Sequence, residues 1–129
     1  YLDVEIGGKG IVADWVYVCD FDHVFADVNR PITEQGITKA PVRIGPDVWI
    51  GTKVSVLRGT TIGSGCVLAA NSVVRGNVPA MSVMGGVPAR VLKDRVEQYE
   101  AAEQQRIDVA DIARKTANAA RLHADQSTP

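Results

Sequence analysis

Aliphatic residues recur at every sixth position along the middle of the chain. This row comprises Ile44, Ile50, Val56, Ile62, Leu68 and Val74. A period of six fits neither the alternation of an ordinary strand nor the 3.6-residue period of a helix. It predicts short strands separated by corners, three of which would complete one coil of roughly 18 residues in a solenoid with a buried aliphatic interior.

A second row of small or β-branched residues follows four places after each member of the first. It comprises Val48, Val54, Thr60, Cys66, Ser72 and Val78. Both rows are expected to face the interior of the coils. Gly45, Gly51 and Gly63 come directly after members of the first row, where permissive φ/ψ angles would help a short strand to turn a corner.

The repeat is interrupted once. The same phase occurs earlier, at Ile6, Val12 and Val18, but it slips by two residues before the later row begins. Residues 24–37, with the sequence VFADVNRPITEQGI, break the repeat and carry residues typical of turns. We expect an excursion loop there, which is either functional, as long loops in compact repeats commonly are, or a tolerated surface insertion.

The end of the chain has a different character. After Val78 the segment PAMSVMGGVPARVLK contains two prolines and two adjacent glycines, which predict neither a regular strand nor a helix, and it should finish the coil stack. From about Lys93 to His123 the chain is rich in Ala, Glu, Gln, Lys and Arg and lacks Gly and Pro, which predicts one or two helices. The expected organisation is a β-helix domain over residues 1–92 and a helical tail over 93–129, and no catalytic role is assigned to the tail.

Composition narrows the class of partner. The chain has 129 residues, 46% of them hydrophobic and only 5% aromatic, so one folded module with an aliphatic core is expected. A formal net charge of -1 without a Lys/Arg cluster argues against nucleic acid or a membrane surface and favours a small ligand. No Cys/His spacing suggests zinc, and Cys19 and Cys66 are too few for a disulfide framework.

Location is inferred from what the sequence lacks. No apolar run reaches the roughly 18 to 20 residues that span a bilayer, and no signal-peptide pattern is present. We therefore expect a cytoplasmic protein with reduced thiols. The chain begins with Tyr rather than Met, so N-terminal coils are expected to be missing.

One histidine stands beside the excursion loop. His23 ends the sequence DFDH, and the other histidine, His123, lies in the predicted tail. Imidazole groups titrate near neutral pH and can accept a proton from a hydroxyl group, although a lone histidine can equally be structural. Asp20, Asp22 or Glu34 could orient the ring through its second nitrogen, or they could be solvated carboxylates. A metal site at these residues is disfavoured because only one histidine is available.

Two segments, IGPDVWIGTKVSVLRGTTIGSGCVLAANSVV and MGGVPARVLK, resemble the bacterial hexapeptide-repeat O-acetyltransferases that act on galactosides, maltose and other saccharides. The resemblance covers roughly residues 18–93. It is most specific at the VWIG box (48–51), at the closing GGVPAR (85–90) and at a histidine ahead of a loop. It implies an all-β solenoid, a left-handed parallel β-helix, and a homotrimer with active sites between adjacent subunits.

The resemblance also implies roles for individual residues. His23 matches the general base of the family, and Thr52 matches a hydroxyl that can donate to the thioester carbonyl, unless it is an ordinary corner residue. Trp49, with Gly51 beside it, is expected to wall the acyl-CoA cleft or to pack against another subunit. Backbone groups around Ala70 match the position that binds the pantetheine arm.

The expected phosphate contacts depart partly from the family. Arg90 and Lys93 match basic positions near the CoA phosphates, as a phosphate-bearing ligand requires. Arg75 and Gly76 stand where the family usually has Thr-Lys, and the sequence Ala-Ala-Asn replaces Gly-Ala-Gly at 69–71. We include Arg75 among the cofactor-binding candidates.

These observations favour transfer of an acetyl or other short acyl group from acyl-CoA to a hydroxyl of a sugar or saccharide-containing acceptor, in a ternary complex and without a metal. The alternatives are N-acyl transfer to an amino sugar, a ping-pong route through Cys19, and a non-catalytic β-helix that serves as a trimerisation scaffold. His23, the VWIG box and GGVPAR together argue against the scaffold.

Overall fold

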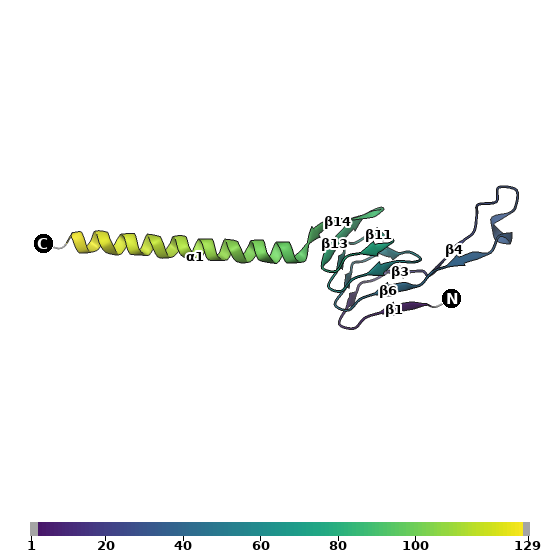
Figure 1. Ribbon diagram of the computed structural model, residues 1–129, viewed down its shortest axis with the longest axis horizontal. Coiled ribbons are helices and arrows are strands. Elements are labelled where there is room, and N and C mark those ends of the chain that lie inside the picture. The colour runs from purple at the N-terminus through teal and green to yellow at the C-terminus, as the bar shows by residue number, and fades with distance from the viewer. Residues whose placement is uncertain (1–2, 128–129) are drawn as a thin grey trace. The chain divides into compact units, whose positions relative to one another are not determined.

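The computed structural model describes residues 3–127 and divides into two compact units, one ending at Arg95 and the other beginning at Val96. Short strands separated by corners make up the first unit (Figure 1). They are β1 (Val4–Ile6), β2 (Ile11–Val12), β3 (Tyr17–Val18), β4 (Phe21–His23), β5 (Ile37–Lys39), β6 (Val42–Ile44), β7 (Trp49–Ile50), β8 (Ser55–Val56), β9 (Thr61–Ile62), β10 (Val67–Leu68), β11 (Val73–Val74), β12 (Asn77–Val78), β13 (Ser82–Gly86) and β14 (Ala89–Asp94).

Successive coils stack in register and form the three sides of a β-helix. One side has the strand order β1-β6-β9-β12, the second β14-β13-β10-β7-β2 and the third β11-β8-β3. Pairing is parallel between coils, and Ile6, Ile44 and Ile62 lie in one column. The six-residue period therefore predicted the architecture correctly, because every sixth residue returns to the interior of the stack.

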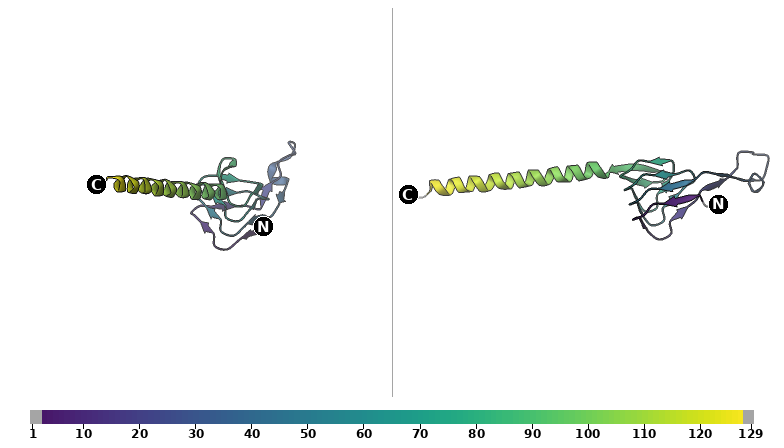
Figure 2. Two further views of the ribbon diagram at one scale, coloured as in Figure 1. Left: turned by 60° about the vertical axis from the view of Figure 1, so that its left-hand side comes forward. Right: turned by 60° about the horizontal axis from the view of Figure 1, so that its bottom comes forward.

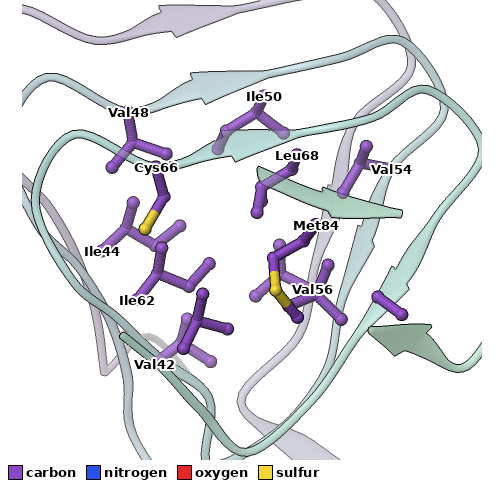
Figure 3. Packing of buried hydrophobic residues seen from close by; sticks show 13 residues of the cluster. Val42, Ile44, Val48, Ile50, Val54, Val56, Ile62, Cys66, Leu68 and Met84 are labelled. Carbon is purple, nitrogen blue, oxygen red and sulfur yellow. The ribbon is translucent and has the colours of Figure 1, made fainter. Parts of the chain in front are cut away.

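The two inward rows form the core. Val42, Val54, Val56 and Val74 are completely buried, and Figure 3 shows the inward side chains from all three sides pointing toward one another. Burying an aliphatic side chain contributes about 1.5 to 3 kcal/mol. The hydroxyl groups of the buried Thr60 and Ser72 donate to the carbonyl groups of the third residue before each, at 2.5 and 2.7 Å. The polar members of the second row are thus buried without losing their hydrogen bonds.

The corner glycines are required for a reason that the sequence did not indicate. Gly45, Gly51 and Gly63 do not have left-handed φ angles. A Cβ atom at these positions would lie 2.5 to 2.8 Å from a backbone nitrogen of the next coil. Among the described residues, the left-handed corner positions belong instead to other glycines, including Gly59 and Gly65, and to Lys9, Trp15, Asp47, Lys53, Asn71 and Met81. The expectation of permissive φ/ψ angles was wrong, and close stacking of the coils explains the glycines.

The last coil is shorter than predicted. Val78 pairs with Ile62 and so belongs to the first inward row, only four residues after Val74. Its assignment to the second row was wrong. The following segment was also expected to be irregular, but β13 continues the ladder on β10, and β14 returns antiparallel to it. The prolines lie outside both strands, at positions where no ladder hydrogen bond is needed.

The chain leaves the coil stack between β3 and β6. Val18 pairs with Val56 in the next coil, after which β4 and β5 form an antiparallel hairpin that protrudes from the stack in every view (Figures 1 and 2). The loop of the hairpin contains the 3-10 helix η1 (Ile32–Glu34). The side-chain amide of Gln35 accepts from the Asp27 nitrogen at 3.0 Å and donates to the Asp27 and Arg30 carbonyls at 2.8 Å. The excursion is therefore an ordered hairpin.

The second unit consists of one helix. The helix α1 (Arg95–Gln126) has 32 residues, and its side chains are largely exposed. Ion pairs along its surface join Arg106 to Glu103 and Asp111 to Arg114 and Lys115. The side chain of Ile112, in the middle of this helix, is 64% exposed. Within residues 3–127, no helix combines the length and the apolar character needed to cross a membrane.

Replacing Gly63 with Ala should destabilise the stack. The new Cβ would lie 2.5 Å from the Ala80 nitrogen, and the backbone of the next coil cannot yield as a flexible side chain would. We expect a loss of about 1 to 3 kcal/mol in the free energy of unfolding, measured by urea denaturation. Gly8→Ala is the matched control, because nothing lies within 4 Å of a Cβ there, and its effect should stay below about 1 kcal/mol. Equal losses in both variants would contradict the stacking explanation.

The thiol of Cys66 should make stability depend on pH. Cys66 is completely buried and donates to the Pro79 carbonyl at 3.1 Å, and burial raises the pKa of its thiol. Above roughly pH 9 the unfolded chain releases this proton while the folded protein retains it, so the free energy of unfolding falls as pH rises. Relative to Cys66→Ala, the parent should lose stability from pH 8 to 10, and Cys19→Ala should follow the parent. Parallel curves for the parent and Cys66→Ala would refute this explanation.

Candidate active site

An open groove follows the outer face of the second side of the β-helix. In β7, Ile50 points into the core, so its neighbour Trp49 points outward and remains 52% exposed. The ring flanks a groove of about 530 Å³ that is also lined by Gly51, Thr52 and Ala70. Four residues that the sequence analysis selected for cofactor binding or catalysis therefore lie around one groove.

Small residues keep this groove open. Ala70 stacks above Thr52, because the Asn71 nitrogen donates to the Thr52 carbonyl at 2.9 Å. A Cβ at Gly51 would lie 2.7 Å from the Ala70 nitrogen, so no larger residue fits between these two coils. The groove therefore has an aromatic wall at Trp49 and a floor of small apolar residues.

The hydroxyl of Thr52 already has an acceptor. Its Oγ1 donates to the Asp14 carbonyl of the coil below at 2.9 Å. To donate to a thioester carbonyl, this hydroxyl must exchange one acceptor for another. The bond is exposed to solvent, so the exchange does not leave a buried carbonyl without a partner.

His23 is displayed on the protruding hairpin. It ends β4, lies opposite Ile37 of β5 and is exposed. Phe21 is on the same face of β4, because alternate residues of a strand share a face. The two rings meet edge to face, with centroids 6.2 Å apart and planes at 83°. The imidazole is thus supported on one side by an aromatic ring and is open to other molecules.

The three carboxylates proposed to orient His23 differ in their partners. The buried Asp20 accepts a hydrogen bond from the Asp3 nitrogen at 2.9 Å, and Asp22 accepts one from Nε of Arg58 at 2.9 Å. Among residues 3–127, the carboxylate of Glu34 has no such partner, and no described hydrogen bond joins any of the three to His23. Glu34 is therefore the most available of the three carboxylates.

The basic residues predicted to bind the cofactor lie in two separate places. Arg90 and Lys93 lie on β14, in the sheet that also contains Trp49, and both are exposed. Arg75 follows β11, at the corner stacked above the corner of residues 57–60, because the Leu57 nitrogen donates to the Val74 carbonyl. In the described part of the chain, no three His, Cys, Asp or Glu side chains gather in a way that could hold a metal ion.

The groove and His23 lie at different corners of one chain. Thr52 is at the corner that precedes β8, whereas the hairpin meets the corner of residues 57–60, which follows β8. The sheet β11-β8-β3 separates these corners. One chain therefore does not bring His23 to the groove. Arg58 and Gln35 were not predicted from the sequence, because their contacts with the hairpin and its loop follow no periodic pattern.

Comparisons with known proteins agree with this architecture. A family model for the bacterial transferase hexapeptide (six repeats) matches residues 41–76. A probable acetyltransferase from Mycobacterium tuberculosis is 57% identical over 121 residues, which are 91% of this chain and 40% of that protein. The chain spans between 40% and 50% of the first curated relatives that it matches.

Two solved structures are also similar. A galactoside acetyltransferase in complex with coenzyme A is 33% identical with a TM-score of 0.64, and the match covers 71% of this chain and 45% of that one. A maltose O-acetyltransferase from Clostridium difficile 630 is 35% identical with a TM-score of 0.65, and the match covers 73% of this chain and 51% of that one.

Proposed function

Because the chain belongs to the hexapeptide-repeat acetyltransferase family, we propose that it transfers an acetyl or other short acyl group from acyl-CoA to a hydroxyl of a sugar or saccharide-containing acceptor. The observation that carries this proposal is the exposed imidazole of His23 on a hairpin that leaves the coil stack. Beside its edge-to-face contact with Phe21, this ring is open to an incoming hydroxyl group, and imidazole groups serve as general bases.

The groove beside Trp49 is suited to the acyl donor. A pantetheine arm is long, narrow and largely apolar, and small residues at Gly51 and Ala70 leave room for such a chain. Arg90 and Lys93 lie on the same sheet and supply cations for the phosphate groups of CoA. A relative of known structure was solved with coenzyme A bound, which supports this choice of donor.

In the proposed mechanism, neutral His23 accepts the proton of the acceptor hydroxyl while the oxygen attacks the thioester carbonyl carbon. Glu34 would accept a hydrogen bond from the second ring nitrogen and stabilise the imidazolium ion that forms. Thr52, after releasing the Asp14 carbonyl, would donate to the oxyanion of the tetrahedral intermediate. When the intermediate collapses, the C–S bond breaks, and the thiolate of CoA receives the proton from His23.

We further propose that two copies of the chain form each active site within a homotrimer. On one chain, the sheet β11-β8-β3 lies between the groove and the hairpin. A groove of one subunit that faces the hairpin of its neighbour would bring donor and base together. In this arrangement, the exposed Trp49 of one subunit and the protruding hairpin of its neighbour would both lie at the subunit interface.

The proposed base can be tested by measuring the release of CoA thiol from acetyl-CoA with a panel of neutral sugars and amino sugars. We expect the parent to transfer to a hydroxyl acceptor and His23→Ala to lose about 100-fold or more in rate, since a positioned base contributes 10²–10⁴-fold. Calorimetry should show that His23→Ala still binds CoA. The control is His123→Ala, which removes the only other histidine and should retain the parent rate.

Other results of these rate and binding measurements would show which part of the proposed function is wrong. Equal rates in the parent and His23→Ala would exclude His23 as the base. Acetylation of amines alone would replace O-acyl transfer with N-acyl transfer. If no sugar is acetylated and CoA does not bind, the non-catalytic scaffold is the better explanation.

A further inference from the structure

The hairpin that carries His23 has little sheet support of its own. Within residues 3–127, strands β4 and β5 form a two-stranded sheet that is separate from the three sides of the β-helix. An isolated two-stranded hairpin is marginally stable in water, and nothing in its ladder fixes its direction relative to the stack. The direction in which His23 is presented must therefore be set where the hairpin joins the coils.

Several hydrogen bonds gather at this junction, and three of them join the two sides of the hairpin to each other or to the corner of residues 57–60. The Ala40 nitrogen donates to the Asp20 carbonyl at 3.0 Å and closes the base of the hairpin. The Gly59 nitrogen donates to the Ala40 carbonyl at 3.2 Å. Nε of Arg58 donates to Oδ2 of Asp22 at 2.9 Å. Two consecutive residues of the 57–60 corner thus hold both sides of the hairpin, through the ion pair on β4 and the backbone bond beyond β5.

The ion pair acts on the strand at the residue next to His23. Asp22 lies between Phe21 and His23 in β4, so its side chain is on the face opposite to theirs. Fixing Asp22 against the corner restrains rotation of β4 about its own axis. The same restraint keeps the Phe21 and His23 rings on the other face, where they meet edge to face.

We propose that Arg58 and Asp22 are positioning residues, whose ion pair holds the hairpin in the orientation from which His23 reaches the acceptor. This inference rests on the function proposed for His23. It also assigns Asp22 a different task from orientation of the imidazole nitrogen, because its carboxylate faces away from the ring and is engaged by Arg58.

The pair should affect function more than folding. Its side chains are 33% and 51% exposed, and ion pairs this open to solvent contribute little to global stability. Neither Arg58 nor Asp22 is among the residues that line the groove beside Trp49 and Ala70. Loss of the pair is therefore expected to lower kcat while leaving the KM for acetyl-CoA unchanged.

The test compares Arg58→Ala, Asp22→Asn and the charge-reversed double variant Arg58→Asp with Asp22→Arg, all in the full chain. Each single variant should lose at least about tenfold in kcat, because a displacement of a reacting group by about 1 Å can cost 10²-fold in rate. The KM for acetyl-CoA should stay within about twofold of the parent value. The double variant should recover most of the loss because the pair is restored. Arg106→Ala, which breaks an ion pair on α1, is the matched control and should behave as the parent.

Hydrogen exchange followed by mass spectrometry gives a readout that does not depend on activity. Residues 21–40 should exchange faster in both single variants and return to the parent rate in the double variant, while the coils remain unchanged. His23→Ala should not accelerate exchange, because it leaves the pair intact. If no acetyl transfer occurs but exchange follows this pattern, the proposed function fails and the junction remains supported. Unchanged exchange and unchanged kcat in the single variants would overturn the proposal.

Discussion

The parallel hydrogen-bond ladder between successive coils is the interaction on which the rest of the structure depends. It sets neighbouring strands about 4.8 Å apart and places each residue above its equivalent in the coil below. At that spacing a corner such as Gly63, where a Cβ would meet the next backbone, accepts only glycine. The same ladder directs Ile50 inward and Trp49 outward, and it stacks Ala70 on Thr52 to form the groove.

Much of the fold could be predicted because its determinant is local and periodic. A six-residue repeat reports directly which residues face inward, and the columns through Ile44 and Ile62 confirm that assignment. Predictions failed where the structure depends on distances between coils or on a change in the length of the repeat. The corner glycines are required by the spacing between coils. Val78 takes its place in the first inward row two residues earlier than the six-residue period predicts. Strands β13 and β14 pair with each other although glycines and prolines lie nearby.

In the candidate site, too, the residues set by the local repeat could be predicted, whereas contacts between distant residues could not. Trp49, Gly51, Thr52 and Ala70 could be selected from the sequence, and the regular stacking of the coils brings them to one groove. The contact between Arg58 and Asp22 could not, because it joins side chains 36 residues apart across the excursion, where the repeat gives no register. His23 lies directly before the loop that the sequence predicted, at the end of strand β4, but Asp20 and Asp22, two of its three expected orienting groups, bind elsewhere.

The central claim is that the base of one subunit acts on a donor held by another, and mixing two inactive variants tests it most directly. His23→Ala lacks the base, whereas Ala70→Trp fills the exposed floor of the groove and leaves the base intact. Each variant alone should transfer acetyl groups at least about 100-fold more slowly than the parent. When both are expressed together, mixed assemblies contain interfaces with an intact His23 and an intact groove, so the account predicts that activity returns. If the mixed assemblies form but remain as inactive as either variant, the active site does not lie between subunits.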